Sequence, residues 1–149
     1  MQKTKLVPPI YFLCTLLLMG ALHFAYPIAR FLDSSANFLG IAVVCVGFAV
    51  SMTAAGMFRS AGTPVIPFER STTLVTTGIY RFTRNPMYLG LVIMTIGVAI
   101  LCGTVATLLP IPIFIGIIRT RFVLREERFL EDIFGEQYRT YKGSVRRWI

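Results

Sequence analysis

Long runs of apolar residues without charge dominate the pattern along this chain. No Asp, Glu, Lys or Arg occurs in three windows, at residues 6–29, 34–58 and 85–118. Each window exceeds the roughly 20 apolar residues that a helix needs to cross the hydrocarbon core of a bilayer. A soluble fold of 149 residues could not hide three such windows. The pattern therefore predicts an all-α, polytopic membrane protein.

The third window determines the number of spans. As one helix, its 34 residues would be about 51 Å long, against a hydrocarbon core of roughly 30 Å. Two short spans that form a helical hairpin, with a turn at residues 102–104, fit this thickness better. We therefore expect four transmembrane helices in a single membrane-embedded domain, residues 1–149, with Pro110 and Pro112 kinking the fourth helix. The spans are expected at about residues 8–30, 36–58, 86–102 and 104–119.

The residues after the fourth span alternate between apolar and charged positions at helical spacing. Apolar side chains from Phe122 to Phe134 would share one face of a helix over about residues 119–134, and Gly135 would end it. This pattern is typical of an amphipathic helix that lies on the cytoplasmic surface of the membrane. Glu126 falls close to the apolar face, where a carboxylate needs a partner or a ligand.

The distribution of positive charge indicates the orientation. Of the 15 Lys and Arg residues, every one except Arg30 falls on one side of a four-span protein. The positive-inside rule makes that side cytoplasmic. We expect a multi-pass integral membrane protein with both termini in the cytoplasm, in the cell inner membrane if the source is a bacterium. Tyr138, Tyr141 and Trp148 would lie at the headgroup level.

The net charge of +8 thus indicates topology and contact with anionic headgroups of the lipid bilayer. We expect no nucleic-acid binding, because the basic residues line a membrane and form no soluble module. Cys14, Cys45 and Cys102 lie in apolar windows and imply neither a disulfide framework nor a metal site. A hydrogen bond from His23, the only histidine, to a neighbouring helix explains this residue better than catalysis does.

The connection between the second and third spans, residues 59–86, is long for so compact a protein, and long connections are often functional. It ends in Arg84-Asn85-Pro86. Pro86 suits the first turn of the third span, where its missing N–H costs nothing. The free N–H groups behind it give this helix a positive end at the cytoplasmic interface, which suits a carboxylate or a phosphate.

Four motifs follow one another in the C-terminal half. They are Gly78-Ile79-Tyr80, Arg84-Asn85-Pro86-Met87-Tyr88-Leu89-Gly90, Glu126-Glu127 and Phe134-Gly135-Glu136-Gln137-Tyr138. Together they resemble the isoprenylcysteine carboxyl methyltransferase and phospholipid methyltransferase group of membrane enzymes, over about residues 72–142. The N-terminal half is similar only in having two hydrophobic spans.

The resemblance implies a methyltransferase that uses S-adenosyl-L-methionine at the cytoplasmic interface. The acceptor would be a lipid or another membrane-soluble molecule, methylated on a carboxylate, a thiol or an amine. In this group the cofactor lies between the loop before span three, the start of that span and the helix after span four. The matching positions are Thr73, Leu74, Val75, Tyr80, Asn85, Pro86, Met87, Tyr88 and Glu126. No catalytic residue is assigned.

The residue types suit this ligand. Glu126 can accept hydrogen bonds from both ribose hydroxyls, and Arg84, a tenth candidate, can pair with the methionine carboxylate. The aromatic faces of Tyr80 or Tyr88 can hold the sulfonium. Glu127 is expected to be a solvated partner of a nearby Arg. Methyl transfer is an in-line displacement and needs no metal.

Three positions depart from the eukaryotic carboxyl methyltransferases. Thr72 and Asn85 stand where those enzymes have His, and Phe122 stands at their substrate-binding Arg. These three departures affect the expected recognition of a prenylcysteine substrate and do not affect the expected binding of the cofactor. Two alternatives stay open: an NADPH-dependent membrane reductase of the steroid or sterol reductase type, and a non-enzymatic small membrane subunit. The intact Arg-Asn-Pro-x-Tyr-x-Gly, together with Glu-Glu, favours the methyltransferase.

Overall fold

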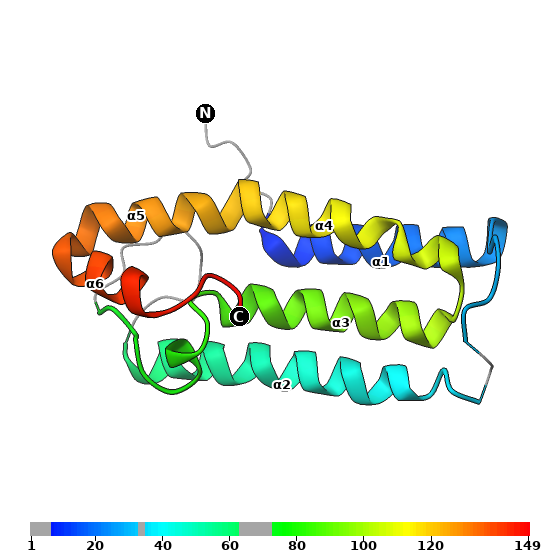
Figure 1. Cartoon of the computed structure of the whole chain (residues 1–149), viewed down its shortest axis with the longest axis horizontal. Helices are drawn as coiled ribbons and strands as arrows, with labels where there is room; N and C mark the ends of the chain where they lie inside the picture. Colours follow the sequence, from blue (N-terminus) through cyan, green and yellow to red (C-terminus); the bar gives the residue numbers. More distant parts are fainter. Residues whose placement is uncertain (1–6, 33–34, 63–72) are drawn as a thin grey trace.

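The computed structural model describes residues 7–32, 35–62 and 73–149. Throughout these residues the regular structure is helical, apart from a single β-bridge between Arg30 and Thr104. Four helices lie side by side, each antiparallel to the one before it (Figure 1). They are α1 (Pro8–Ala25), α2 (Leu39–Ser60), α3 (Pro86–Cys102) and α4 (Pro110–Ile118).

The apolar helices differ in length. Three are long and apolar enough to cross a membrane, namely α1, α2 and the segment Val105–Phe134, in which 3₁₀, α- and π-helical turns follow one another. The equally apolar α3 has 17 residues and matches its predicted bounds, because Pro86 occupies its first turn and Gly103 its left-handed C-cap. In contrast, α1 ends before its predicted limit, since the residue ahead of Pro27 is pushed out of the helical region.

The last long helix differs from the sequence prediction at its start. Pro110 does not kink a helix; it begins α4, after the short 3₁₀ turn η2 (Val105–Leu108). At the residue where the fourth span and the tail helix were expected to meet, α4 continues through the π-helical turn η3 (Arg119–Val123) directly into α5 (Leu124–Phe134).

The chain reverses after α5. Gly135, with a φ of 52°, ends this helix as predicted, because a positive φ is readily adopted only by glycine. A further helix that the sequence did not predict, α6 (Glu136–Ser144), then folds back towards the start of α3 (Figure 1). These segments and the end of α2 lie at one end of the helical bundle.

Small residues let α2 and α3 approach each other closely. A Cβ atom added at Gly47 would lie 2.6 Å from the carbonyl oxygen of Gly90. Close backbone approach supplies van der Waals contact in a bilayer, where lipid tails are as apolar as side chains. At the opposite end of the bundle, the ring Nδ1 of His23 lies 3.2 Å from the hydroxyl of Thr104, which agrees with the expected hydrogen-bonded imidazole.

The tyrosines of α6 are buried inside the protein and do not face lipid headgroups. Tyr138 is 1% exposed and Tyr141 8%, and both pack in one cluster with Tyr80 and Ala54. The Tyr141 hydroxyl donates to the carbonyl oxygen of Tyr80 at 2.7 Å. Trp148, also expected among headgroups, packs against the apolar cluster around Tyr88 and Phe114. Burial of these rings anchors α6 to the bundle.

Candidate functional site

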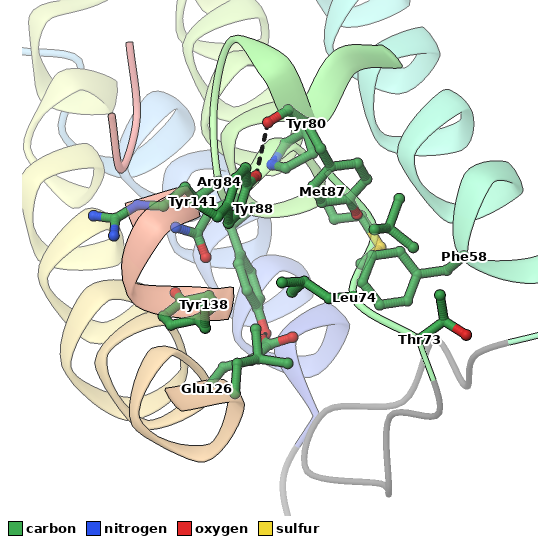
Figure 2. A pocket seen from close by; sticks show the side chains of 14 residues that line it. Phe58, Thr73, Leu74, Tyr80, Arg84, Met87, Tyr88, Glu126, Tyr138 and Tyr141 are labelled. Atoms are coloured by element: carbon green, nitrogen blue, oxygen red, sulfur yellow. Dashed lines mark hydrogen bonds between the residues drawn. The ribbon is translucent and has the colours of Figure 1, made fainter. Parts of the chain in front are cut away.

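A cavity lies where the end of α2, residues 73–77, the 3₁₀ turn η1 (Gly78–Arg81), the start of α3, α5 and α6 meet (Figure 2). All ten residues that the sequence analysis named line this one cavity. They are Thr73, Leu74, Val75, Tyr80, Arg84, Asn85, Pro86, Met87, Tyr88 and Glu126. The structure therefore brings together positions from three separate motifs.

The lining also includes Phe58, Leu130, Tyr138 and Tyr141, which the sequence analysis did not assign to the site. Tyr138 belongs to the Phe-Gly-x-x-Tyr motif, so the sequence contained a motif that could have assigned it to the site. Phe58 lies near the end of α2 and Leu130 lies in α5, and no sequence motif marks either residue.

Part of the connection at residues 59–86 is helical, since α2 extends to Ser60. Thr72 lies outside the described residues.

The cavity is narrow. Its volume is about 30 Å³, against about 380 Å³ for the neighbouring cavity described below. A ligand of nucleoside size would therefore have to widen it.

Tyr80 contributes a hydroxyl that is available to a ligand. The residue is 4% exposed, and among the described residues its hydroxyl has no hydrogen-bond partner. Burial, and after it the nearby charge of Glu126, raises the pKa of Tyr80 well above its ordinary value. The hydroxyl is therefore a neutral donor, and a buried donor without a partner is costly unless a ligand satisfies it.

Glu126 and Tyr88 meet in the cavity wall (Figure 2). The Tyr88 hydroxyl donates to Oε2 of Glu126 at 2.6 Å, the length of a charge-assisted hydrogen bond. This bond supplies the partner that the sequence predicted for a carboxylate near an apolar face. A carboxylate has about four lone-pair sites, so Glu126 can accept further hydrogen bonds.

Arg84 and Glu127 form a buried ion pair beside the cavity. Nη2 of Arg84 lies 3.4 Å from Oε1 of Glu127, and the Arg84 side chain is only 8% exposed. Its Nε and Nη1 are buried and have no hydrogen-bond partner among the described residues, and Arg84 itself lines the cavity, so these two groups are available to a ligand. Glu127 is indeed an arginine partner, but it is 5% exposed and not solvated.

A second cavity of about 380 Å³ adjoins the first. Its lining comes from the start of α1, from α2 and from α3, and is largely apolar, with Met52, Ala55 and Leu91 among its residues. Tyr88, Glu126 and Met87 line both cavities. These three side chains therefore form a shared wall between a narrow aromatic cavity and a wider apolar one.

The fold and the site define an all-helical, multi-pass membrane protein with paired cavities at one end of its bundle. The family model described as phospholipid methyltransferase matches residues 35–137, which is more than half of the chain. The chain belongs to this family.

Known proteins agree with this assignment. The chain is 32% identical over 72 residues to a protein-S-isoprenylcysteine O-methyltransferase of Schizosaccharomyces pombe, covering 48% of this chain and 30% of that protein. It is 40% identical over 78 residues to methanethiol S-methyltransferase 1 of Bradyrhizobium diazoefficiens, covering 48% of this chain and 24% of the relative. The chain thus spans less than a third of either relative.

A solved structure shares the fold. It is the eukaryotic intramembrane Ras methyltransferase, an isoprenylcysteine carboxyl methyltransferase, and it superimposes with a TM-score of 0.71 at 24% sequence identity. The match covers 95% of this chain and 51% of that one. The likeness establishes the membrane fold of the described helices.

Proposed function

We propose that this protein is an S-adenosylmethionine-dependent methyltransferase that acts on a lipid or another membrane-soluble acceptor at the cytoplasmic interface. One observation carries the proposal: all ten positions that the resemblance assigned to the cofactor site or that suit its carboxylate, from Thr73 to Glu126, line one cavity. Membership of the phospholipid methyltransferase family supports methyl transfer, and the relatives named above are themselves methyltransferases acting on different acceptors.

The cavity offers groups suited to each part of the cofactor. The unpartnered hydroxyl of Tyr80 can donate to it, and Glu126 can accept hydrogen bonds from the ribose hydroxyls. The aromatic faces of Tyr80 and Tyr88 suit a sulfonium. The methionine carboxylate suits Arg84, whose Nε and Nη1 have no partner among the described residues, and the free N–H groups at the start of α3. When bound, S-adenosylmethionine supplies an activated methyl group.

The second cavity is the proposed acceptor site. Its apolar lining suits a membrane-soluble molecule that enters sideways between helices, and the shared wall at Tyr88 and Glu126 would hold the acceptor beside the cofactor. Holding two reactants in place can contribute roughly 7–11 kcal/mol to lowering a barrier. Exclusion of water further favours an anionic acceptor, whose charge is neutralised as it attacks.

We also propose a four-span topology in one domain, with both termini and the two cavities on the cytoplasmic side. At about 26 Å, the 17 residues of α3 are slightly short for a hydrocarbon core of roughly 30 Å. However, α3 lies antiparallel between α2 and α4 (Figure 1). If those helices cross the bilayer, α3 crosses it too, and α5 then continues α4 in line out of the hydrocarbon core on the cytoplasmic side (Figure 1).

Ligand binding separates the proposal from its rivals. The protein, purified in detergent or nanodiscs, is titrated calorimetrically with S-adenosylhomocysteine and, separately, with NADPH. We expect saturable binding of S-adenosylhomocysteine and none of NADPH. Binding of NADPH alone would identify a reductase, and binding of neither would leave a non-enzymatic membrane subunit.

A further inference from the structure

The last residues of the chain are bonded to the turn that precedes α3 (Figure 1). The backbone N–H of Arg84 donates to the carbonyl oxygen of Arg146 at 3.0 Å. The Thr83 hydroxyl and the Asn85 side-chain amide both donate to the carbonyl oxygen of Arg147 at 3.1 Å. Two successive carbonyl groups of the C-terminal segment therefore hold three successive residues of the turn.

The side chain of Arg147 reaches Glu127 from the same segment. Its Nε lies 3.0 Å from Oε1 and its Nη2 2.9 Å from Oε2, a two-point contact. Oε1 of Glu127 is also 3.4 Å from Nη2 of Arg84 and 3.4 Å from the side-chain amide of Asn85. One buried carboxylate thus connects Arg147 to two residues that line the cofactor cavity.

We propose that Arg147 is a positioning residue for the cofactor cavity, which it shapes through Glu127 without lining it. This inference rests on the proposed function. Arg147 makes the shortest contacts to Glu127, whereas Arg84 makes one longer contact. A buried carboxylate is costly when it loses a partner. Without Arg147, Glu127 would therefore draw Arg84 and Asn85 towards itself and displace the turn that begins α3.

Neighbouring arginines provide a matched comparison. Arg146 precedes Arg147, carries the same charge and is exposed. We compare Arg147→Gln with Arg146→Gln by calorimetric titration of the full-length protein with S-adenosylhomocysteine. For Arg147→Gln we expect the Kd to rise about tenfold, the size of a coupling within one hydrogen-bond network, with the number of binding sites per chain unchanged. Arg146→Gln should keep the wild-type Kd.

Two further variants test the route through Glu127. In a Glu127→Gln background, Arg147→Gln should add little to the rise in Kd, since the carboxylate it positions is already absent. Arg147→Lys should recover only part of the affinity, because an ammonium keeps the charge but lacks the planar two-point contact of a guanidinium.

A purely structural role predicts a different result. It would reduce the number of functional sites per chain and leave the Kd of the folded fraction unchanged, and that outcome would overturn the proposal. Equal Kd values for Arg147→Gln and Arg146→Gln would overturn it as well, while leaving the proposed function intact. Absence of S-adenosylhomocysteine binding by the wild-type protein would instead reject the proposed function, and the positioning role with it.

Discussion

At the scale of single residues, two adjacent carboxylates have different surroundings because they lie about 100° apart around one helix. Glu126 faces the cavity and bonds to Tyr88. Glu127 faces away, towards Arg84 and Arg147. Sequence reasoning placed Glu126 near the apolar face and Glu127 beside an arginine, as the structure does, but it placed Glu127 in solvent. The reason is that its burial depends on the C-terminal segment, whose path no local pattern predicts.

Glu126→Gln tests the cofactor contact. The substitution keeps the shape of the side chain and removes a charged acceptor, whose hydrogen bonds contribute about 1.5–3 kcal/mol. We expect the Kd for S-adenosylhomocysteine to rise roughly ten- to a hundredfold, while the amide oxygen of Gln still accepts the Tyr88 hydrogen bond in the ligand-free protein. The control is Glu131→Gln, also on α5 but paired with Lys142 at the surface. Small, equal effects at both positions would mean that α5 is only an anchor.

Tyr80→Phe removes a hydroxyl that has no partner in the described structure. Because no hydrogen bond is lost in the unliganded protein, its melting temperature should stay the same or rise. A ligand bond to that hydroxyl contributes about 0.5–1.5 kcal/mol, so the Kd for S-adenosylhomocysteine should rise roughly two- to tenfold. Calorimetry and thermal unfolding measure the two effects separately. A lower melting temperature with unchanged affinity would assign the hydroxyl to packing alone.

At the scale of elements, the hydrophobic pattern predicts most helices but not how they join. The bounds of α3 follow from Pro86 and Gly103, which act locally. The π-helical turn that joins α4 to α5 does not, because neither the hydrophobic pattern nor a Gly or Pro marks residues 119–123. The helix α6 was missed because its tyrosines resemble interfacial residues, and only tertiary packing buries them.

The contact between α2 and α3 gives a prediction at this scale. Gly47→Ala places a methyl group 2.6 Å from the Gly90 carbonyl oxygen and forces the helices apart. Overpacking of this kind costs about 1–3 kcal/mol, so the melting temperature in detergent should fall. Gly56→Ala, on the same helix, meets nothing within 4 Å and should leave it unchanged or raise it. Equal effects of the two substitutions would contradict the close packing.

At the scale of the whole molecule, the four-span topology predicts the accessibility of two exposed positions. Cys14, Cys45 and Cys102 are free and are first replaced by Ser. A single cysteine at Ser35 should then react with a membrane-impermeant maleimide from outside intact cells. One at Ser144 should react only after the membrane is permeabilised. External labelling at Ser144 would contradict a cytoplasmic C-terminus and the location of both cavities.

The central claim is methyl transfer from S-adenosylmethionine to a membrane-soluble acceptor. The direct measurement is incubation of the purified protein with methyl-labelled S-adenosylmethionine and a total lipid and small-molecule extract, followed by mass spectrometry. We predict a labelled product in the lipophilic fraction, strongly reduced when Glu126→Gln replaces the wild-type protein. Efficient labelling of a strictly water-soluble acceptor, with the lipophilic fraction unlabelled, would contradict the account.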